Sequence, residues 1–197
     1  MQPDLHADIN NDKRMNVMRN YFKETDRISF SVWTSEDLEL AKSLWGDPDV
    51  ARYICAAGVF TDEEIENRLH LEISNYENYR IQYFPMFEKE TNEFIGCCGL
   101  RPFEGQTDIL EIGFHLKKKF WGTGMAKEAA SAMIGYGFHD LHVKELRAGH
   151  NPNNVASRKL LAKLGFQYTG DLYYPPTGLN HPSYTMKQPS KAKDSDA

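Results

Sequence analysis

The segment from Lys117 to Ala130, KKKFWGTGMAKEAA, constrains the fold of this chain more than any other. Its lysines lead into Gly122 and Gly124, and strong helix-forming residues follow directly. Because glycine has no Cβ, the backbone there can turn tightly and come close to a bound group. The first N–H groups of a helix lack intrahelical acceptors and attract an anion, and neighbouring lysines strengthen that attraction. The segment therefore predicts a phosphate pocket, and the plainer alternative is a glycine turn in front of an ordinary helix.

The spacing of the glycines discriminates between phosphate-binding motifs. A P-loop requires a lysine after its last glycine, and Met125 stands there instead, so a P-loop is excluded. A dinucleotide fingerprint needs a third glycine where this chain has Lys127, which leaves a nicotinamide-dependent oxidoreductase as an alternative only. Lys119-Phe120-Trp121-Gly122-Thr123-Gly124 fits a third pattern, Arg/Gln-x-x-Gly-x-Gly/Ala, with lysine in the first position.

Composition limits the classes of function. The chain has 197 residues, 41% of them hydrophobic, which indicates one domain with a real core. A net charge of −5 argues against a nucleic-acid partner. No apolar run approaches the roughly 20 residues that cross a bilayer, and the N-terminus lacks an apolar signal core, so we expect a cytoplasmic protein without a membrane partner. Cys55, Cys97 and Cys98 lack metal-ligand spacing and predict reduced packing residues and no metal site.

Hydrophobic periodicity predicts an α+β domain at residues 25–188, between a mobile or cloning-derived arm (1–24) and a disordered tail (189–197). Helices are expected after the capping residues at Thr34 and Thr61, from 122 to about 138, and from 153 to 164. Strands are expected at 27–33, 80–88, 93–101, 108–116, 143–149, 166–173 and 183–187. This order predicts a mixed, largely antiparallel central sheet of about seven strands flanked by about four helices.

The segment 151–172, NPNNVASRKLLAKLGFQYTGDL, resembles the second conserved block of the GNAT superfamily of N-acetyltransferases, in which Asn-x-x-Ser/Ala opens a helix that ends in Lys-Leu-Gly-Phe. In that family the pattern Arg/Gln-x-x-Gly-x-Gly/Ala precedes this block, as it does here, and holds the pyrophosphate of coenzyme A. The stretches ETDRISFSVWTSEDL and LWGDPDV resemble the branch of ribosomal-protein-alanine N-acetyltransferases. The resemblance covers about residues 25–188. It implies a GNAT-like fold and acetyl transfer from acetyl-CoA to a primary amine by direct attack in a ternary complex.

The resemblance also implies where the cofactor lies. In the resembling fold the pantetheine arm occupies the gap between two parting strands, here 108–116 and 143–149, and a backbone N–H near 114–116 polarises the thioester carbonyl. Asn154 would bind the pantetheine and Ser157 would lie near the sulfur. Without the family, Asn154 is a helix cap and the Ser157 hydroxyl bonds back to a carbonyl one turn earlier. The expected cofactor contacts are Phe114, His115, Leu116, Lys119, Phe120, Trp121, Gly122, Thr123, Gly124, Met125, Ala126, Lys127, Asn154, Ser157 and Arg158.

Glu111 is the first candidate for the catalytic base. Strand alternation places it on one face with Gly113 and His115. Burial would raise the pKa of its carboxyl and suit it to accept the amine proton, whereas the alternative role is a salt bridge on a sheet face. His115 is a weaker candidate, and Asp171, in the loop from which the resembling branch can draw a base, leaves the choice open.

The sequence lacks the usual proton donor to the departing thiolate. Many relatives place a tyrosine four residues after the Ser/Ala of the second block, and this chain has Leu161 there. Ser157 is the available substitute as acid. The missing tyrosine keeps a non-catalytic acyl-CoA-binding module as an alternative function.

The acceptor is read from the branch resemblance alone. A protein N-terminal α-amine is favoured over an aminoglycoside or a polyamine. Aromatic residues in 53–60 and 76–87 either shape a groove for the acceptor or belong to the core. The chain is expected to act as a monomer or a homodimer.

Overall fold

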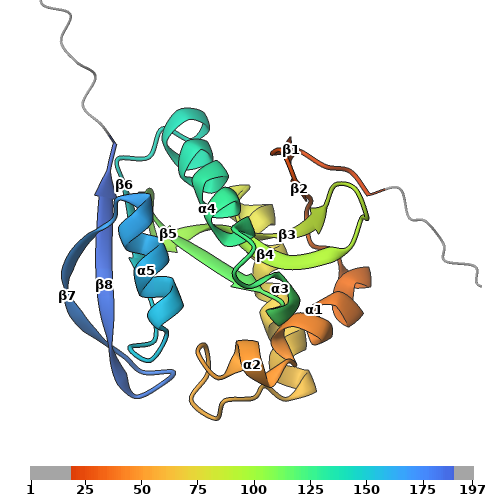
Figure 1. Ribbon diagram of the computed structural model, residues 1–197, viewed down its shortest axis with the longest axis horizontal. Coiled ribbons are helices and arrows are strands. Elements are labelled where there is room, and N and C mark those ends of the chain that lie inside the picture. The colour runs from red at the N-terminus through yellow and green to blue at the C-terminus, as the bar shows by residue number, and fades with distance from the viewer. Residues whose placement is uncertain (1–18, 189–197) are drawn as a thin grey trace, which may run out of the picture.

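The computed structural model describes residues 19–188, which form one eight-stranded sheet with helices on both faces (Figure 1). The strand order is β1-β2-β3-β4-β5-β6-β8-β7, and β5 with β6 is the parallel pair. The strands are β1 (Lys23–Glu24), β2 (Ile28–Phe30), β3 (Tyr83–Glu88), β4 (Phe94–Phe103), β5 (Gln106–Leu116), β6 (Glu145–Gly149), β7 (Gln167–Tyr174) and β8 (Leu179–Lys187). The helices are α1 (Leu38–Trp45), α2 (Pro48–Ala51), α3 (Asp62–Tyr79), α4 (Met125–Gly135) and α5 (Val155–Leu164), with short turns η1 (Ser35–Asp37), η2 (Lys118–Phe120) and η3 (Tyr136–Asp140). The predicted α+β class, with a largely antiparallel sheet, is confirmed.

Each face of the sheet has its own hydrophobic core. Successive strand residues point to opposite faces, so Phe84 and Cys98 pack with α4 and α5, whereas Tyr83 and Cys97 pack with α1 and α3. Small residues of α4, such as Ala129 and Ala130, are fully buried and let that helix approach the sheet closely. The centre of the sheet is therefore covered on both sides, and its β5–β6 region is held between two packed layers.

Local capping signals in the sequence predict the helix starts well. Thr61 and Glu64 form the expected reciprocal capping box at α3, with the Thr61 N–H donating to the Glu64 carboxylate at 2.8 Å. The Asn154 side chain accepts a hydrogen bond from the Ser157 N–H at 3.0 Å and so caps α5. Gly165 ends the same helix in the left-handed conformation, at φ +90°.

The ordered domain begins earlier than the predicted boundary at residue 25. Lys23 and Glu24 form β1, which pairs antiparallel with β2 and adds an eighth strand to the expected seven or so. Arg19 forms an ion pair with Asp37, and the Phe22 ring packs on Phe84 with 4.4 Å between centroids. These tertiary contacts fix a segment whose local sequence is polar. The rest of the expected arm, 1–18, and the expected tail, 189–197, lie outside the described residues.

The two central parallel strands pair for only a short distance. The register joins Ile109 to Glu145, Leu110 to Leu146 and Glu111 to Arg147. Beyond Glu111, β5 continues to Leu116 beside β4, while the rest of β6 pairs with β8 alone. The strands therefore part after Glu111, as the resemblance implies.

The described part of the chain contains neither a membrane-spanning helix nor a cluster of metal ligands. None of the helices within 19–188 is both long and apolar enough to cross a membrane. Over the same residues, no group of three His, Cys, Asp or Glu side chains could hold a metal ion.

Candidate functional site

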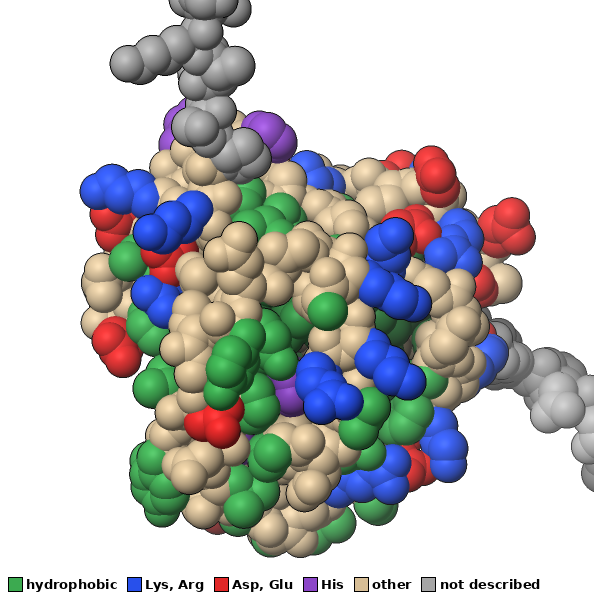
Figure 2. All heavy atoms as spheres, turned by 60° about the vertical axis from the view of Figure 1, so that its left-hand side comes forward, with side chains coloured by type: hydrophobic (Ala, Val, Ile, Leu, Met, Phe, Trp, Pro, Cys, Tyr) green, Lys and Arg blue, Asp and Glu red, His purple; other side chains and the backbone are tan. Residues whose placement is uncertain are grey.

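A cavity of about 1040 Å³ opens where β5 and β6 part. Its walls come from the second half of β5, the start of α4, the end of β6, α5 and β8, and it extends to residues of α2 and α3. The space-filling view in Figure 2, turned toward the side of α5 and β7, shows this face hollowed near its centre, with hydrophobic side chains in the hollow and several Lys and Arg side chains beside it. The cavity combines an apolar interior with a cationic margin.

The glycine turn presents open backbone amides to this cavity. Gly122 and Gly124 have φ of +76° and +87°, a conformation that favours glycine, and both line the cavity. The N–H of Trp121 still bonds to the Lys118 carbonyl at 3.0 Å. Within residues 19–188, however, the N–H groups of Gly122, Thr123 and Gly124 donate to no protein acceptor. The predicted anion-binding arrangement at the start of α4 is therefore open.

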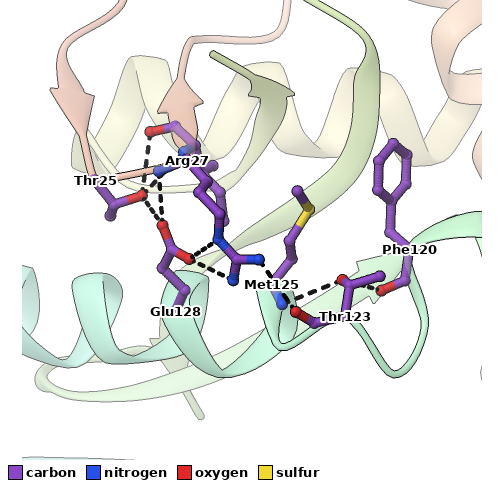
Figure 3. A network of polar contacts seen from close by, with 7 residues as sticks. Thr25, Arg27, Phe120, Thr123, Met125 and Glu128 are labelled. Atoms are coloured by element: carbon purple, nitrogen blue, oxygen red, sulfur yellow. Dashed lines mark hydrogen bonds and ion pairs between the residues drawn. The ribbon is translucent and has the colours of Figure 1, made fainter. Parts of the chain in front are cut away.

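A polar network holds the turn from the side of β2 (Figure 3). The Arg27 guanidinium donates to the Glu128 carboxylate at 2.8 Å and to the Thr123 carbonyl at 3.1 Å. The Thr25 hydroxyl donates to the other Glu128 oxygen at 2.7 Å. Burial would raise the pKa of Glu128, but the hydrogen bonds from Thr25 and Arg27 lower it below its ordinary value. Glu128 thus stays ionised and holds the Arg27 guanidinium, which in turn binds the Thr123 carbonyl.

Backbone amides of β5 also point toward the gap. Its pairing with β4 is regular from Leu110 to Leu116, so alternate residues direct their N–H groups to opposite edges. The Lys117 N–H donates to the Ile95 carbonyl of β4 at 2.9 Å, whereas the Asp108 carbonyl accepts from Lys144 on the other side at 2.8 Å. The N–H groups of Phe114 and Leu116 therefore point to the edge that β6 has left.

Most of the predicted cofactor contacts meet at the cavity. The predicted residues that line it are Phe114, His115, Leu116, Trp121, Gly122, Gly124, Ala126, Lys127, Asn154 and Ser157.

Five predicted contacts have side chains that do not line the cavity, each for a structural reason. Phe120 and Met125 are buried in the core beneath the turn. Lys119 forms an ion pair with Glu93, and Arg158 is exposed and is absent from the cavity wall. The Thr123 hydroxyl donates back to the Phe120 carbonyl at 2.7 Å, so it faces the turn itself.

Two lysines of α5 that also line the cavity, Lys159 and Lys163, are not among the predicted contacts. Their spacing of four places them on one helix face, which is the signal that could have found them. With Lys127 they put three cations in the cavity wall, whereas the predicted Lys119 is neutralised by Glu93.

Glu111 lies in the cavity wall at the point where the strands part. Its register neighbours are Arg101 on β4 and Arg147 on β6, but these pair with Glu72 and Glu145 respectively. Within the described residues no cation lies within 4.0 Å of Glu111, so the alternative role as a salt-bridge partner is not realised. Burial raises the pKa of its carboxyl, against the opposing effect of the nearby arginines. Such a carboxyl suits proton exchange with an amine.

His115 is held as a neutral side chain. Its Nδ1 lies 3.3 Å from the Trp45 indole Nε1, which can only donate, so Nδ1 accepts and Nε2 carries the proton. Burial lowers the pKa of His115 well below its ordinary value, and Arg68 and Arg101 add to the effect. Nδ1 therefore accepts a hydrogen bond and Nε2 already carries a proton, so neither nitrogen is free to take the proton of an amine.

Ser157 and Leu161 occupy the two positions from which a side chain could protonate the departing thiolate. The half-buried Ser157 side chain lines the cavity, and its hydroxyl bonds to no carbonyl within residues 19–188. Leu161, at the position where many relatives have tyrosine, is 1% exposed. Asp171 does not reach the cavity and accepts a hydrogen bond from the Tyr168 hydroxyl at 2.9 Å.

Tyr184 of β8 is a cavity residue that the sequence did not indicate. Its hydroxyl lies 3.3 Å from His150 Nε2. His150 Nδ1 donates to the Asn151 carbonyl at 2.8 Å, so Nε2 is the accepting nitrogen and Tyr184 the donor. Only the tertiary pairing of Tyr184 with Ala148 of β6 brings this hydroxyl to the site.

A polar cluster at the α3 side of the cavity was also missed. Arg101 forms an ion pair with the fully buried Glu72, and its guanidinium lies 4.0 Å from the centroid of the Tyr83 ring. Arg68 of α3 lies against the Trp45 ring at 5.0 Å. In the sequence these arginines are ordinary polar positions of a helix and a strand, and no local pattern marks them.

Comparisons with known proteins agree with this geometry. Residues 27–167 match the Acetyltransferase (GNAT) domain family. The uncharacterized N-acetyltransferase p20 of Bacillus licheniformis is 33% identical over 153 residues, which cover 74% of this chain and 82% of the relative. The ribosomal protein uS5 alanine N-acetyltransferase of Escherichia coli (strain K12) is 32% identical over 89 residues, 45% of this chain and 46% of the relative.

Solved structures share the fold. RimL, a ribosomal L7/L12 alpha-N-protein acetyltransferase solved in complex with coenzyme A, superimposes with a TM-score of 0.72 and 14% identity over 85% of this chain and 98% of its own. The family match includes β5, the glycine turn and α5, the elements that build the cavity. This chain therefore belongs to the GNAT family and is an acetyl-CoA-dependent N-acetyltransferase.

Proposed function

We propose that the gap between β5 and β6 binds acetyl-CoA and that a primary amine attacks the thioester directly in a ternary complex. The observation that carries this proposal is the continuity of one cavity from the open amides of Gly122–Gly124, past the N–H groups of Phe114 and Leu116, to Glu111. The turn amides and Lys127 would bind the pyrophosphate. Asn154 still has its side-chain NH₂ group to donate to the pantetheine, because its oxygen caps α5.

The chemistry then needs a neutral amine, a donor to the oxyanion and a proton for the thiolate. Glu111 accepts the proton of the attacking amine, and the N–H of Phe114 stabilises the oxyanion. Ser157 supplies the proton to the sulfur, and Tyr184, which donates to His150, is the second hydroxyl in the same wall. Orientation of the two reactants in one cavity can account for roughly 7–11 kcal/mol of the barrier.

For the acceptor we propose a protein N-terminal α-amine. The support is the similarity to the uS5 alanine N-acetyltransferase of Escherichia coli, which extends over only part of both chains. Small-molecule amines such as aminoglycosides or polyamines are the alternative acceptors. A non-catalytic acyl-CoA-binding module is the other alternative, and an intact carboxylate at Glu111 argues against it.

A turnover screen tests the proposal. Coenzyme A release is measured with acetyl-CoA and a panel of N-terminal peptides, amino acids, polyamines and aminoglycosides, using the wild type and the Glu111→Gln variant. Asp108→Asn is the matched control, since Asp108 is a carboxylate of the same strand that pairs with Lys144 outside the cavity wall. We expect turnover that falls strongly in Glu111→Gln and persists in Asp108→Asn. Tight acetyl-CoA binding without turnover of any amine would support the non-catalytic module instead.

A further inference from the structure

Arg68 is a cavity residue whose charge is neutralised directly by no group within residues 19–188. Its guanidinium lies against the rings of Trp45 and Phe60, at 5.0 and 5.7 Å from their centroids. Within residues 19–188 none of its N–H groups donates a hydrogen bond, and its Nε is buried without a partner. A buried donor without an acceptor costs stability unless a ligand or water supplies one. Within residues 19–188, the Arg68 guanidinium therefore has hydrogen-bond donors that are available to a ligand.

The neighbouring carboxylates are already committed. Glu72, one turn further along α3, gives one oxygen to Arg101 and the other to the Tyr83 N–H at 2.8 Å. Glu104 and Glu111 are the acidic residues of the cavity wall, and neither forms an ion pair within 4.0 Å inside the described range. Arg68 and Arg101 face the same space, and with Glu111 ionised their two positive charges are matched in number by Glu72 and Glu111. Within residues 19–188, however, no carboxylate lies within 4.0 Å of Arg68, whereas Arg101 is paired with Glu72.

We propose that Arg68 binds a carboxylate carried by the acceptor, an inference that rests on the proposed function. The acceptor would place its amine toward Glu111 and its carboxylate against the guanidinium, whose planar fork matches a carboxylate. The aromatic faces of Trp45 and Phe60 keep the fork oriented. The carboxylate belongs either to a free amino acid or to an acidic side chain near a peptide N-terminus.

The charge balance favours this class over the others. An acceptor with one ammonium and one carboxylate adds no net charge and pairs its two groups with Glu111 and Arg68, whereas a dianionic phosphate would bring two negative charges close to Glu72 and Glu111. Polyamines and aminoglycosides would bring further ammonium groups next to Arg68 and Arg101. The additional ammonium groups of those acceptors are repelled by Arg68, whereas the carboxylate of an acidic acceptor accepts a charge-assisted hydrogen bond from it.

The test compares paired acceptors in which a carboxylate is replaced by the amide of nearly the same shape. Amino acids are compared with their amides, and peptides with glutamate near the N-terminus with their glutamine counterparts, in coenzyme A release assays. We expect the wild type to favour the carboxylate form by about tenfold or more in kcat/KM, mainly through KM. Arg68→Gln should abolish the preference, and Arg68→Lys should retain part of it. The folded fraction cancels in the carboxylate-to-amide ratio of each variant, and the difference in amine basicity cancels when the ratio of the wild type is divided by that of the variant.

Arg80→Gln is the matched control. Arg80 caps the same helix, and its guanidinium lies 5.5 Å from the Tyr76 ring, but it does not line the cavity. This variant should keep the full preference. The amino acid and peptide arms distinguish the two sources of the carboxylate.

A binding arm separates this inference from the proposed function. N-acetyl products in carboxylate and amide form are titrated calorimetrically into the protein saturated with coenzyme A. If no amine is turned over but the wild type still binds the carboxylate product more tightly than Arg68→Gln does, the Arg68 site stands and the proposed function fails. Equal or better turnover and binding of the amide or polyamine forms, or a preference that survives in Arg68→Gln, would overturn the inference.

Discussion

Replacing Gly122 by alanine separates the role of the glycine turn in folding from its role in binding. An added Cβ at Gly122 would meet no protein atom within 4 Å, so the cost to the fold comes only from its φ of +76°. A left-handed alanine costs about 1–2 kcal/mol, of which about 0.4–1 kcal/mol is offset because alanine also restricts the unfolded chain. The net loss of about 1 kcal/mol corresponds to a fall in Tm of about 2–4 °C for a chain of this length.

The expected effect on acetyl-CoA binding is larger. The Cβ would occupy the open side of the turn, where we place the pyrophosphate. Loss of one charge-assisted hydrogen bond removes about 1.5–3 kcal/mol of binding free energy, which raises Kd roughly 10- to 150-fold. Isothermal titration calorimetry with coenzyme A measures Kd, and differential scanning calorimetry measures Tm.

Gly105 provides a closely matched control. It lies in the β4–β5 hairpin with φ of +77°, and an added Cβ there also meets nothing within 4 Å. Gly105→Ala should lower Tm by the same few degrees and leave Kd within about twofold of wild type. The reasoning is refuted if Gly122→Ala binds coenzyme A as tightly as the wild type, or if both variants weaken binding equally.

Three further predictions concern the base, the turn and the acid. Glu111→Gln should lower kcat by about 10²–10⁴, and wild-type turnover should rise as the pH rises through the raised pKa of this carboxyl. Because ionisation of a group with a raised folded pKa costs stability, Glu111→Gln should also raise Tm at neutral pH, a gain that should vanish below the ordinary Glu pKa of about 4.3; an unchanged Tm would contradict this. Arg27→Gln should lower Tm little, because its pair with Glu128 is half-exposed and contributes about 0.2–1 kcal/mol, but should weaken coenzyme A binding severalfold by releasing the Thr123 carbonyl; an unchanged Kd from calorimetry would argue against it. Ser157→Ala should reduce kcat more than Tyr184→Phe in steady-state assays if Ser157 protonates the thiolate, and the reverse order would assign that role to Tyr184.

The parts of the site that the sequence predicted are those set by local chemistry. The turn at Gly122 and Gly124, the cap at Asn154 and the helix stop at Gly165 depend on a few neighbouring residues, so their pattern is readable. The alternation that places Glu111 in the cavity wall follows from a regular strand. These elements suffice to predict the α+β fold and one wall of the cavity.

The parts that the sequence missed depend on long-range contacts. The sequence pattern predicts that Lys119 contacts the phosphate, whereas the fold places Glu93 against it. Arg68 is one of several polar residues on α3, and only the packing of that helix on Trp45 makes its position special. Tyr184 reaches the cavity because β8 inserts between β6 and β7, an order that the succession of elements along the chain does not specify.

The most direct test of the account is a coenzyme A titration followed by the backbone amide resonances of the isotopically labelled protein. Saturable binding should shift Gly122, Thr123 and Gly124 most strongly, together with Phe114 and Leu116 in the gap between the strands. Binding that leaves the three turn amides unshifted, or no binding at all, would contradict the claim that these open amides hold the pyrophosphate.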